Sequence, residues 1–263
     1  MPSTRYWVGC SGWFYRGWRG LFYPADFPMH RWFEYYQSHF SIVEMNSTFY
    51  RFPKAATTRA WVRQARPDFA FVTKVHRSIS HFHQYDRWPA FYEAMGPLGD
   101  RLKGILIQLP PSVRMDEDFW RRLLVPLSQS FFHFVEFRHV TWFQALGRII
   151  KDLPLHVGIV SVSAPASTHL PEELVVTHET AYVRFHGRTA WYRYDYSDAE
   201  LRAWADRLRA ARLKQGFAFF NNDVGGSAPR NALRLMDLLT GASVPGAGFQ
   251  GIANCGSEWR RQA

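Results

Sequence analysis

Short apolar runs that end in polar, chemically capable residues recur along the whole chain. Six of these endings are Glu44–Thr48, Lys74–His76, Gln108, Glu136–His139, Arg184–Arg188 and Asn221–Asp223. In a closed parallel barrel, the loops that follow the strands meet at one face, and polar residues from many strand ends form a single site there. The recurrence therefore favours a barrel whose site lies at the carboxyl ends of its strands.

The hydrophobic periodicity predicts eight strands that alternate with helices. We expect strands over residues 7–10, 42–49, 69–75, 104–109, 134–138, 156–162, 182–186 and 217–222, and helices over 31–38, 57–66, 85–95, 116–127, 142–150, 198–213 and 228–239. Between Ser163 and Thr180, where Pro165 and Pro171 interrupt the pattern, we expect a long loop over the barrel mouth. This order predicts an α/β fold, a (β/α)8 TIM-type barrel, which forms a single domain over residues 1–263.

The charge balance favours anionic partners. Lys and Arg number 32 against 22 for Asp and Glu, which gives a formal net charge of +10. Because the basic residues are scattered rather than gathered in one tract, a small anionic molecule is favoured over non-specific binding of nucleic acid.

The cysteines and the amino-terminal residues indicate in which cellular compartment the protein is expected. Cys10 and Cys255 are too few for a disulfide framework and form no Cys-x-x-Cys pair, which favours a reducing compartment. Residues 1–6 lack the apolar segment of a signal peptide, and no apolar run is long enough to cross a bilayer. We therefore expect a cytoplasmic protein with no membrane partner.

The alternation of side chains along a strand sorts the polar residues by the face they occupy. Glu44 and Asn46 share one parity, while the apolar Val43 and Met45 have the other and suit the layer under the helices. The same test directs a larger polar set into the barrel: Lys74, His76, Glu136, Arg138, Arg184, His186, Asn221 and Asp223.

This polar set can supply acid, base and an anion clamp. Glu44 and Glu136 are placed to flank a substrate, one as general base and the other as general acid or cation partner, with His186 as a proton shuttle or hydrogen-bond donor. Burial among cations is expected to lower the pKa of Lys74 and of His186, and the same cations would keep both glutamates ionised. In a purely structural alternative, the glutamates and the cations only satisfy one another, and His76 and His139 have hydrogen-bonding roles at strand ends.

Three further features of the sequence are candidates for binding a ligand. The loop from Asn221 to Ser227 contains Gly225-Gly226 before the last helix and predicts a phosphate contact, although such glycine pairs are also ordinary turn chemistry. Among many aromatic residues, Trp13 and Trp191 are the candidates for stacking on a substrate. A divalent metal at Glu44, Glu136, His186 and Asp223 stays open, but no closely spaced ligand motif supports it, so we predict no cofactor.

Several motifs together resemble the YecE-like family, which is known as a domain of unknown function. They are Gly9–Trp13, Val43–Tyr50, Gln108–Pro111, Val135–His139, Tyr182–Arg188 and Phe220–Asp223, in the order of the family and over nearly the whole chain. The resemblance implies a barrel fold, and the positions that match it are Glu44, Asn46, Lys74, Gln108, Glu136, Arg138, Arg184, His186, Asn221 and Asp223. Where relatives often place an aspartate late in the sixth strand, this chain has Val160-Ser161-Val162-Ser163.

The sequence thus predicts an enzyme, a hydrolase or an isomerase, that uses acid/base chemistry on a small anionic substrate, phosphorylated or sugar-like. The catalytic candidates are Glu44, Glu136 and His186, and the substrate-binding candidates are Trp13, Asn46, Lys74, Gln108, Arg138, Arg184, Asn221, Asp223 and Ser227. Two alternatives remain: a metal-dependent phosphodiesterase that acts on nucleic acid, and a non-catalytic module that binds a metabolite or a partner.

Overall fold

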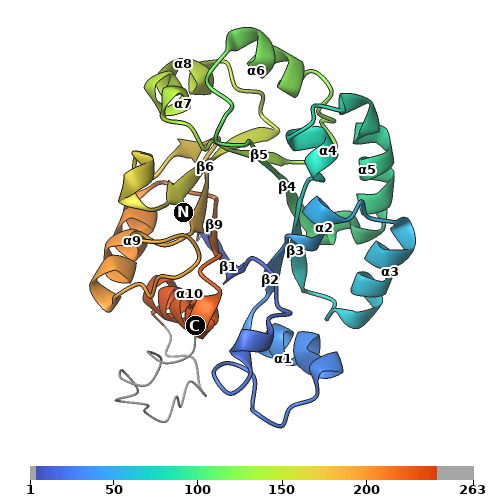
Figure 1. Cartoon of the computed structure of the whole chain (residues 1–263), viewed down its shortest axis with the longest axis vertical. Helices are drawn as coiled ribbons and strands as arrows, with labels where there is room; N and C mark the ends of the chain where they lie inside the picture. Colours follow the sequence, from blue (N-terminus) through green and yellow to red (C-terminus); the bar gives the residue numbers. More distant parts are fainter. Residues whose placement is uncertain (1–3, 242–263) are drawn as a thin grey trace, which may run out of the picture.

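Parallel strands form a nearly closed barrel with helices around it in the computed structural model, which describes residues 4–241 (Figure 1). The eight barrel strands are β1 (Arg5–Cys10), β2 (Ile42–Met45), β3 (Ala70–Lys74), β4 (Leu102–Gln108), β5 (His133–Glu136), β6 (Val157–Ser163), β8 (Thr180–Phe185) and β9 (Gln215–Phe220). They pair in the order β1-β9-β8-β6-β5-β4-β3-β2, and a short β7 (Val176–Thr177) pairs antiparallel with β8. The predicted TIM-type barrel is therefore confirmed.

A tyrosine bridges the seam between β1 and β2. The Tyr36 hydroxyl accepts a hydrogen bond from the Cys10 N–H at 2.8 Å and donates one to the Ile42 carbonyl at 3.1 Å. Gly9 allows the two strands to approach, because a Cβ atom at this position would lie 2.5 Å from the Ile42 carbonyl oxygen. The backbone groups at the seam thus find partners without a direct ladder between the strands.

The helices cover the outside of the barrel and mostly lie where the periodicity predicts them. They are α1 (Trp32–His39), α2 (Ser47–Tyr50), α3 (Ala55–Gln64), α4 (Arg77–Ser80), α5 (Trp88–Met95), α6 (Glu117–Leu124), α7 (Val140–Gln144), α8 (Leu146–Lys151), α9 (Asp198–Ala210) and α10 (Ser227–Thr240). The helix predicted over 142–150 is two helices, α7 and α8.

The second strand is shorter than predicted. It ends at Met45, and the residues expected to extend it to Phe49 instead form α2. The Thr48 hydroxyl stabilises this turn, because it contacts the carbonyls of Met45 at 2.9 Å and Lys74 at 2.5 Å. Such local bonds from a threonine side chain compete with an extended strand.

The long loop after β6 is confirmed. Its first part lies near the carboxyl ends of the strands, where the Ala166 N–H donates to the Arg188 carbonyl at 3.0 Å and Glu172 accepts a hydrogen bond from the Ser163 hydroxyl at 2.5 Å. The chain then runs back along β6, where the Val175 N–H donates to the Ser161 hydroxyl at 2.8 Å. Burial of Val175 in the apolar layer holds this second part against the barrel wall, where a helix lies in other repeats.

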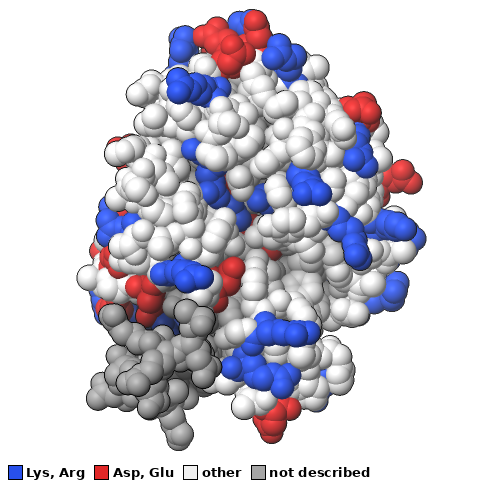
Figure 2. Space-filling view, viewed as in Figure 1, with Lys and Arg blue, Asp and Glu red and all other residues white. Residues whose placement is uncertain are grey.

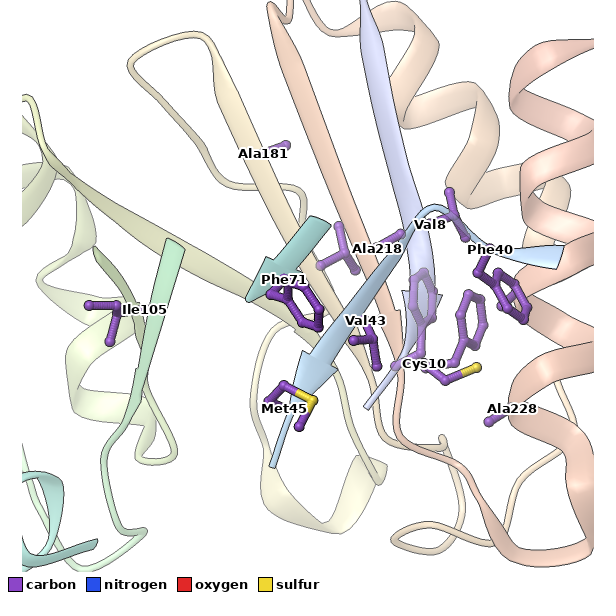
Figure 3. Close-up of a cluster of buried hydrophobic side chains, with 14 of the residues drawn as sticks. Val8, Cys10, Phe40, Val43, Met45, Phe71, Ile105, Ala181, Ala218 and Ala228 are labelled. Carbon is purple, nitrogen blue, oxygen red and sulfur yellow. The ribbon is translucent and has the colours of Figure 1, made fainter. Parts of the chain in front are cut away.

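The apolar core has two layers. An outer layer lies between the strands and the helices, and an inner layer fills the lower part of the barrel. The outer layer contains Val43 and Met45, as the alternation predicts, together with Phe71 and the buried, reduced Cys10 (Figure 3). The inner layer contains Trp7, Ile42, Ala70, Val72, Leu106, Phe134, Val160, Val162, Tyr182, Phe217 and Phe219. Polar side chains that face inward like this inner layer lie above it, at the carboxyl ends of the strands. Cys255 and the end of the predicted domain lie outside the described residues.

None of the helices within residues 4–241 has the length and apolar character that a membrane crossing needs.

Candidate functional site at the barrel mouth

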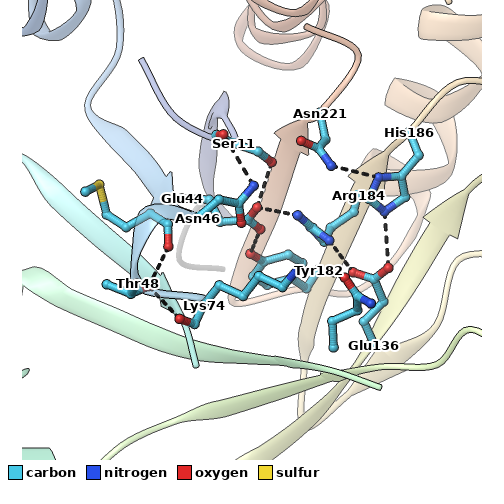
Figure 4. Close-up of polar contacts among 12 residues, drawn as sticks. Ser11, Glu44, Asn46, Thr48, Lys74, Glu136, Tyr182, Arg184, His186 and Asn221 are labelled. Atoms are coloured by element: carbon cyan, nitrogen blue, oxygen red, sulfur yellow. Dashed lines mark hydrogen bonds and ion pairs between the residues drawn. The ribbon is translucent and has the colours of Figure 1, made fainter. Parts of the chain in front are cut away.

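Arg184 lies at the centre of a buried polar cluster near the carboxyl ends of the strands (Figure 4). Its Nη1 donates to Glu136 Oε2 at 2.5 Å, and its Nη2 donates to Glu44 Oε1 at 2.6 Å. All three side chains are fully buried. An arginine from β8, and not an open space, therefore lies between the two carboxylates that the sequence analysis placed on either side of a substrate.

Glu44 has further hydrogen-bond donors within the barrel. The Ser11 hydroxyl donates to its Oε1 at 2.6 Å, and the Tyr182 hydroxyl donates to its Oε2 at 2.5 Å. Neither donor was among the predicted site residues. Alternation marks both as inward-facing, because Tyr182 shares the parity of Arg184 on β8 and Ser11, one residue beyond β1, shares the parity of Trp7.

Glu136 is held ionised by three neighbours. Burial alone would raise the pKa of its carboxyl group, but Arg138, Arg184 and His186 hold this pKa well below its usual range. Arg138 donates through Nε to Glu136 Oε1, and His186 Nε2 lies 3.2 Å from the same oxygen. The expectation that Glu136 stays ionised is confirmed.

His186 is neutral in the folded protein. Burial, reinforced by Arg138, lowers the pKa of its imidazole to about 3. The ring is held on both edges, because Nδ1 accepts from Asn221 Nδ2 at 3.2 Å and Nε2–H donates to Glu136 Oε1 at 3.2 Å. The predicted direction of this pKa shift is confirmed, and a neutral imidazole fixed in this way can relay hydrogen bonds between strands.

Lys74 is the buried amine of the cluster, and Figure 4 shows it reaching from β3 toward Arg184 and Glu136. Its Nζ donates to Gln108 Oε1 at 2.7 Å and lies 4.1 Å from the centre of the Phe49 ring. Burial, reinforced by Arg184, lowers the pKa of the amine to about 7, as the sequence analysis expected. No carboxylate in residues 4–241 forms an ion pair with it.

Two buried oxygens at the site lack hydrogen-bond partners within the described residues, Asn46 Oδ1 and Asp223 Oδ1. The Asn46 amide is held only by a donation to the Ser11 carbonyl at 3.4 Å. Burial, against the opposing effect of Arg184, raises the pKa of the Asp223 carboxyl group to about 7. Because buried acceptors without donors are costly, both oxygens are candidates to accept hydrogen bonds from a bound molecule.

A cavity of about 350 Å³ opens beside this cluster, and its lining includes Trp13 and Asn46. At Ser47 and Trp61 it meets a second cavity of about 590 Å³, whose wall carries Arg51 and Lys54. Lys and Arg side chains gather around the hollow in the middle of the face in Figure 2. These two cavities beside the cluster are therefore open and carry positively charged side chains, which suits a small anion.

The remaining predicted binding residues are two tryptophans and the residues of the loop before α10. Trp191, from the loop after β8, lies over the Arg138 guanidinium, with Cζ 4.5 Å from its ring centre. The Trp13 ring packs on Phe33, with 4.5 Å between the two ring centres. Ser227 begins α10, is buried and lies 3.5 Å from Arg230 Nη2. The glycine pair before it has positive φ angles of 77° and 69°, which the turn requires, and a phosphate contact there stays a prediction.

His76 and His139 have equivalent structural roles. Each caps the short helix that follows its strand, because His76 Nδ1 accepts from the Ser78 N–H at 3.1 Å and His139 Nδ1 accepts from the Thr141 N–H at 3.3 Å. The hydrogen-bonding alternative stated for these two histidines is confirmed.

Of the four residues considered for a divalent metal, His186 and Glu136 are in contact, with 3.2 Å between Nε2 and Oε1. Within residues 4–241, no three His, Cys, Asp or Glu side chains are grouped so that they could hold a metal ion. The reason is local, because Arg184 separates Glu44 from Glu136 and already occupies an oxygen of each.

Comparisons with known proteins agree with this architecture. The family model described as "Protein of unknown function DUF72" matches residues 7–248. The UPF0759 protein YunF of Bacillus subtilis is 26% identical over 269 residues, 88% of this chain and 94% of YunF. The UPF0759 protein YecE of Escherichia coli K12 is 31% identical over 181 residues, 59% of this chain and 66% of YecE.

Two solved structures share the fold. A DUF72 family protein from Thermotoga maritima superposes with a TM-score of 0.78 at 28% identity, covering 89% of this chain and 99% of that one. A DUF72 family protein from Enterococcus faecalis, 21% identical, gives a TM-score of 0.80 and covers 90% of this chain and 96% of that one.

Proposed function

This chain belongs to the DUF72 family of proteins of unknown function, and from the geometry of its site we propose that it is an enzyme that transfers protons on a small anionic substrate at the barrel mouth. The observation that carries the proposal is Lys74, a buried amine at the end of a barrel strand whose pKa lies near 7 and which has no carboxylate partner in the described part of the chain. A group that gains and loses a proton near neutral pH is suited to general acid/base catalysis. We infer an isomerisation or a hydrolysis of a phosphorylated or sugar-like compound.

Arg138 is the proposed anion clamp. Its side chain is 8% exposed, so it lies at the upper boundary of the cluster, whereas Arg184 is buried beneath it. Nε is bound to Glu136 and Nη2 faces His186, while Nη1 has no hydrogen-bond partner within residues 4–241. A guanidinium held by Glu136 and by the Trp191 ring is pre-oriented to bind a phosphate or carboxylate oxygen.

The two glutamates then position cations and do not exchange protons. Glu136 has a pKa well below its usual range, which makes it a poor proton donor at neutral pH. Glu44 accepts from Arg184, Ser11 and Tyr182 through both oxygens. Asp223, whose pKa lies near 7, replaces them as the second candidate for proton transfer, and Asn46 is proposed to contact the substrate from the adjoining cavity.

Anion binding tests this proposal. Inorganic phosphate, glycolate and a panel of sugar phosphates, titrated at fixed ionic strength, are expected to raise the unfolding temperature of the protein. An anion present at one hundred times its Kd would add about 2.7 kcal/mol to the free energy of unfolding. Arg138→Met should weaken the binding of that anion by about tenfold or more, since it removes a charge-assisted hydrogen bond.

The matched control is Arg209→Met, which removes an exposed arginine that pairs, among the described residues, with Asp206. This variant should bind the anion as the parent does. Equal affinity in the parent and in Arg138→Met would remove Arg138 from the site, and no stabilisation by any anion would contradict an anionic substrate.

A further inference from the structure

The chain uses lysine sparingly, and it buries one lysine at the site. Only five of its 32 basic residues are lysines, at positions 54, 74, 103, 151 and 214. Lys54, Lys151 and Lys214 are exposed, and Lys103 is half-buried with its Nζ on the Asp100 carbonyl. Of the five lysines in the sequence, Lys74 alone is buried. The other cations of its cluster are arginines.

A primary amine offers chemistry that a guanidinium does not. An arginine at this position would bind an anion through more hydrogen bonds and would stay charged at every ordinary pH. A lysine that is buried beside other cations holds a neutral amine, which is a nucleophile toward carbonyl carbon.

We propose that Lys74 Nζ forms a covalent imine with the carbonyl carbon of a small anionic aldehyde or ketone bound at the barrel mouth. This inference rests on the proposed function, whose substrate class it narrows to carbonyl compounds that carry a phosphate or a carboxylate.

The surroundings of the amine fit this step. Gln108 Oε1 accepts one N–H of Lys74 at 2.7 Å and so orients the nitrogen, while the Phe49 ring, centred 4.1 Å away, shields it from solvent. Burial, reinforced by Arg184 and Arg138, disfavours the ammonium form, so a large share of the amine is neutral and available for attack near pH 7. Arg138 is also placed to hold the anionic end of the same molecule.

The step balances without an oxidant, a reductant or a cofactor. The nitrogen lone pair forms a bond to the carbonyl carbon, and the π electrons of the carbonyl move to its oxygen. A proton passes from nitrogen to that oxygen, and loss of one water molecule from the carbinolamine gives the imine. Hydrolysis returns the amine and the carbonyl compound. A protonated imine withdraws electrons from the neighbouring carbon, which directs the site's acid/base chemistry to that carbon.

Reductive trapping tests the proposal with the whole chain. The protein is incubated at pH 7 with glyoxylate or with glycolaldehyde phosphate and cyanoborohydride, and the reduced adduct at each lysine is quantified by peptide mass spectrometry. Lys74 is expected to react at least about tenfold faster than the exposed Lys54, Lys151 and Lys214, because a far larger share of its amine is neutral at this pH than for an ordinary lysine. Glycolate and inorganic phosphate should slow the labelling of Lys74 alone.

The outcomes separate this inference from the proposed function. Labelling of Lys74 no faster than that of the exposed lysines, while phosphate or glycolate still stabilises the protein, would overturn the imine and leave the anion site standing. Rapid labelling without protection or stabilisation by either anion would support the reactive amine and overturn the anionic substrate. Lys151→Arg, the control for an exposed lysine away from the cavities, should leave the rate at Lys74 unchanged.

Discussion

Replacing Arg184 by Met is expected to lower the free energy of unfolding by about 3–5 kcal/mol at pH 7. The substitution keeps an apolar stem in the barrel but removes the cation that donates to both Glu44 and Glu136, which are fully buried. Glu136 keeps its pair with Arg138, whereas Glu44 keeps only the Ser11 and Tyr182 hydroxyls and has no other cation partner within the described residues. Burial of a charge without its counter-ion is among the costliest changes in a protein. Urea unfolding, followed by a far-ultraviolet signal, measures the loss.

The same charge balance predicts the effect of a second substitution. Adding Glu44→Gln to Arg184→Met removes the carboxylate that has lost its cation, so the double variant should recover a large part of the lost stability. Arg209→Met, at an exposed arginine, should change stability by less than about 0.5 kcal/mol. A loss below about 1 kcal/mol in Arg184→Met would show that the cluster is hydrated and not buried as described.

Replacing Lys74 by Met is expected to change how stability depends on pH. The amine has a pKa near 7 in the folded protein and near 10.4 in an unfolded chain, so the unfolded state holds more protons between these values. The free energy of unfolding of the parent therefore rises with pH in this window relative to the variant, by about 2–3 kcal/mol between pH 7 and pH 9. Below pH 7 the amine is charged in both states and the full cost of its burial destabilises the parent.

The difference between parent and variant, measured by urea unfolding at each pH, isolates the amine from other titrating groups. The variant retains the four charged groups that act on the Lys74 amine, which are Arg184, Glu136, Arg138 and Glu44. Lys151→Met, at an exposed lysine, should run parallel to the parent at every pH. A difference between parent and Lys74→Met that stays constant from pH 7 to pH 9 would mean that the folded amine titrates in its ordinary range.

Much of the site was predictable because alternation along a barrel strand is a strong geometric rule. It placed Glu44, Arg184 and His186 inside and Val43 and Met45 under the helices, and the structure has them there. The same rule extends to Tyr182, which the sequence analysis did not use. Directions of the pKa shifts of Lys74 and His186 followed from burial among cations.

The pairing of the inward side chains was not predictable in the same way. Alternation says which face a residue occupies, but not how far each strand is shifted along the barrel or which side chains meet across it. Arg184 lies between Glu44 and Glu136, which are 140 and 48 residues away from it in the sequence. No local pattern in the sequence indicates these two contacts. Local competition also decided where β2 ends, because Thr48 bonds to nearby carbonyls and winds α2.

A pH titration of the lysine side chains by nuclear magnetic resonance tests the proposed mechanism most directly. With lysine labelled at Cε and Nζ, the five lysines give few enough signals to follow individually, and Lys74→Arg assigns one of them. The proposal predicts that one signal titrates near pH 7 and disappears in Lys74→Arg. A spectrum in which no lysine titrates below about pH 9 would contradict Lys74 as the proton-transfer group of this barrel.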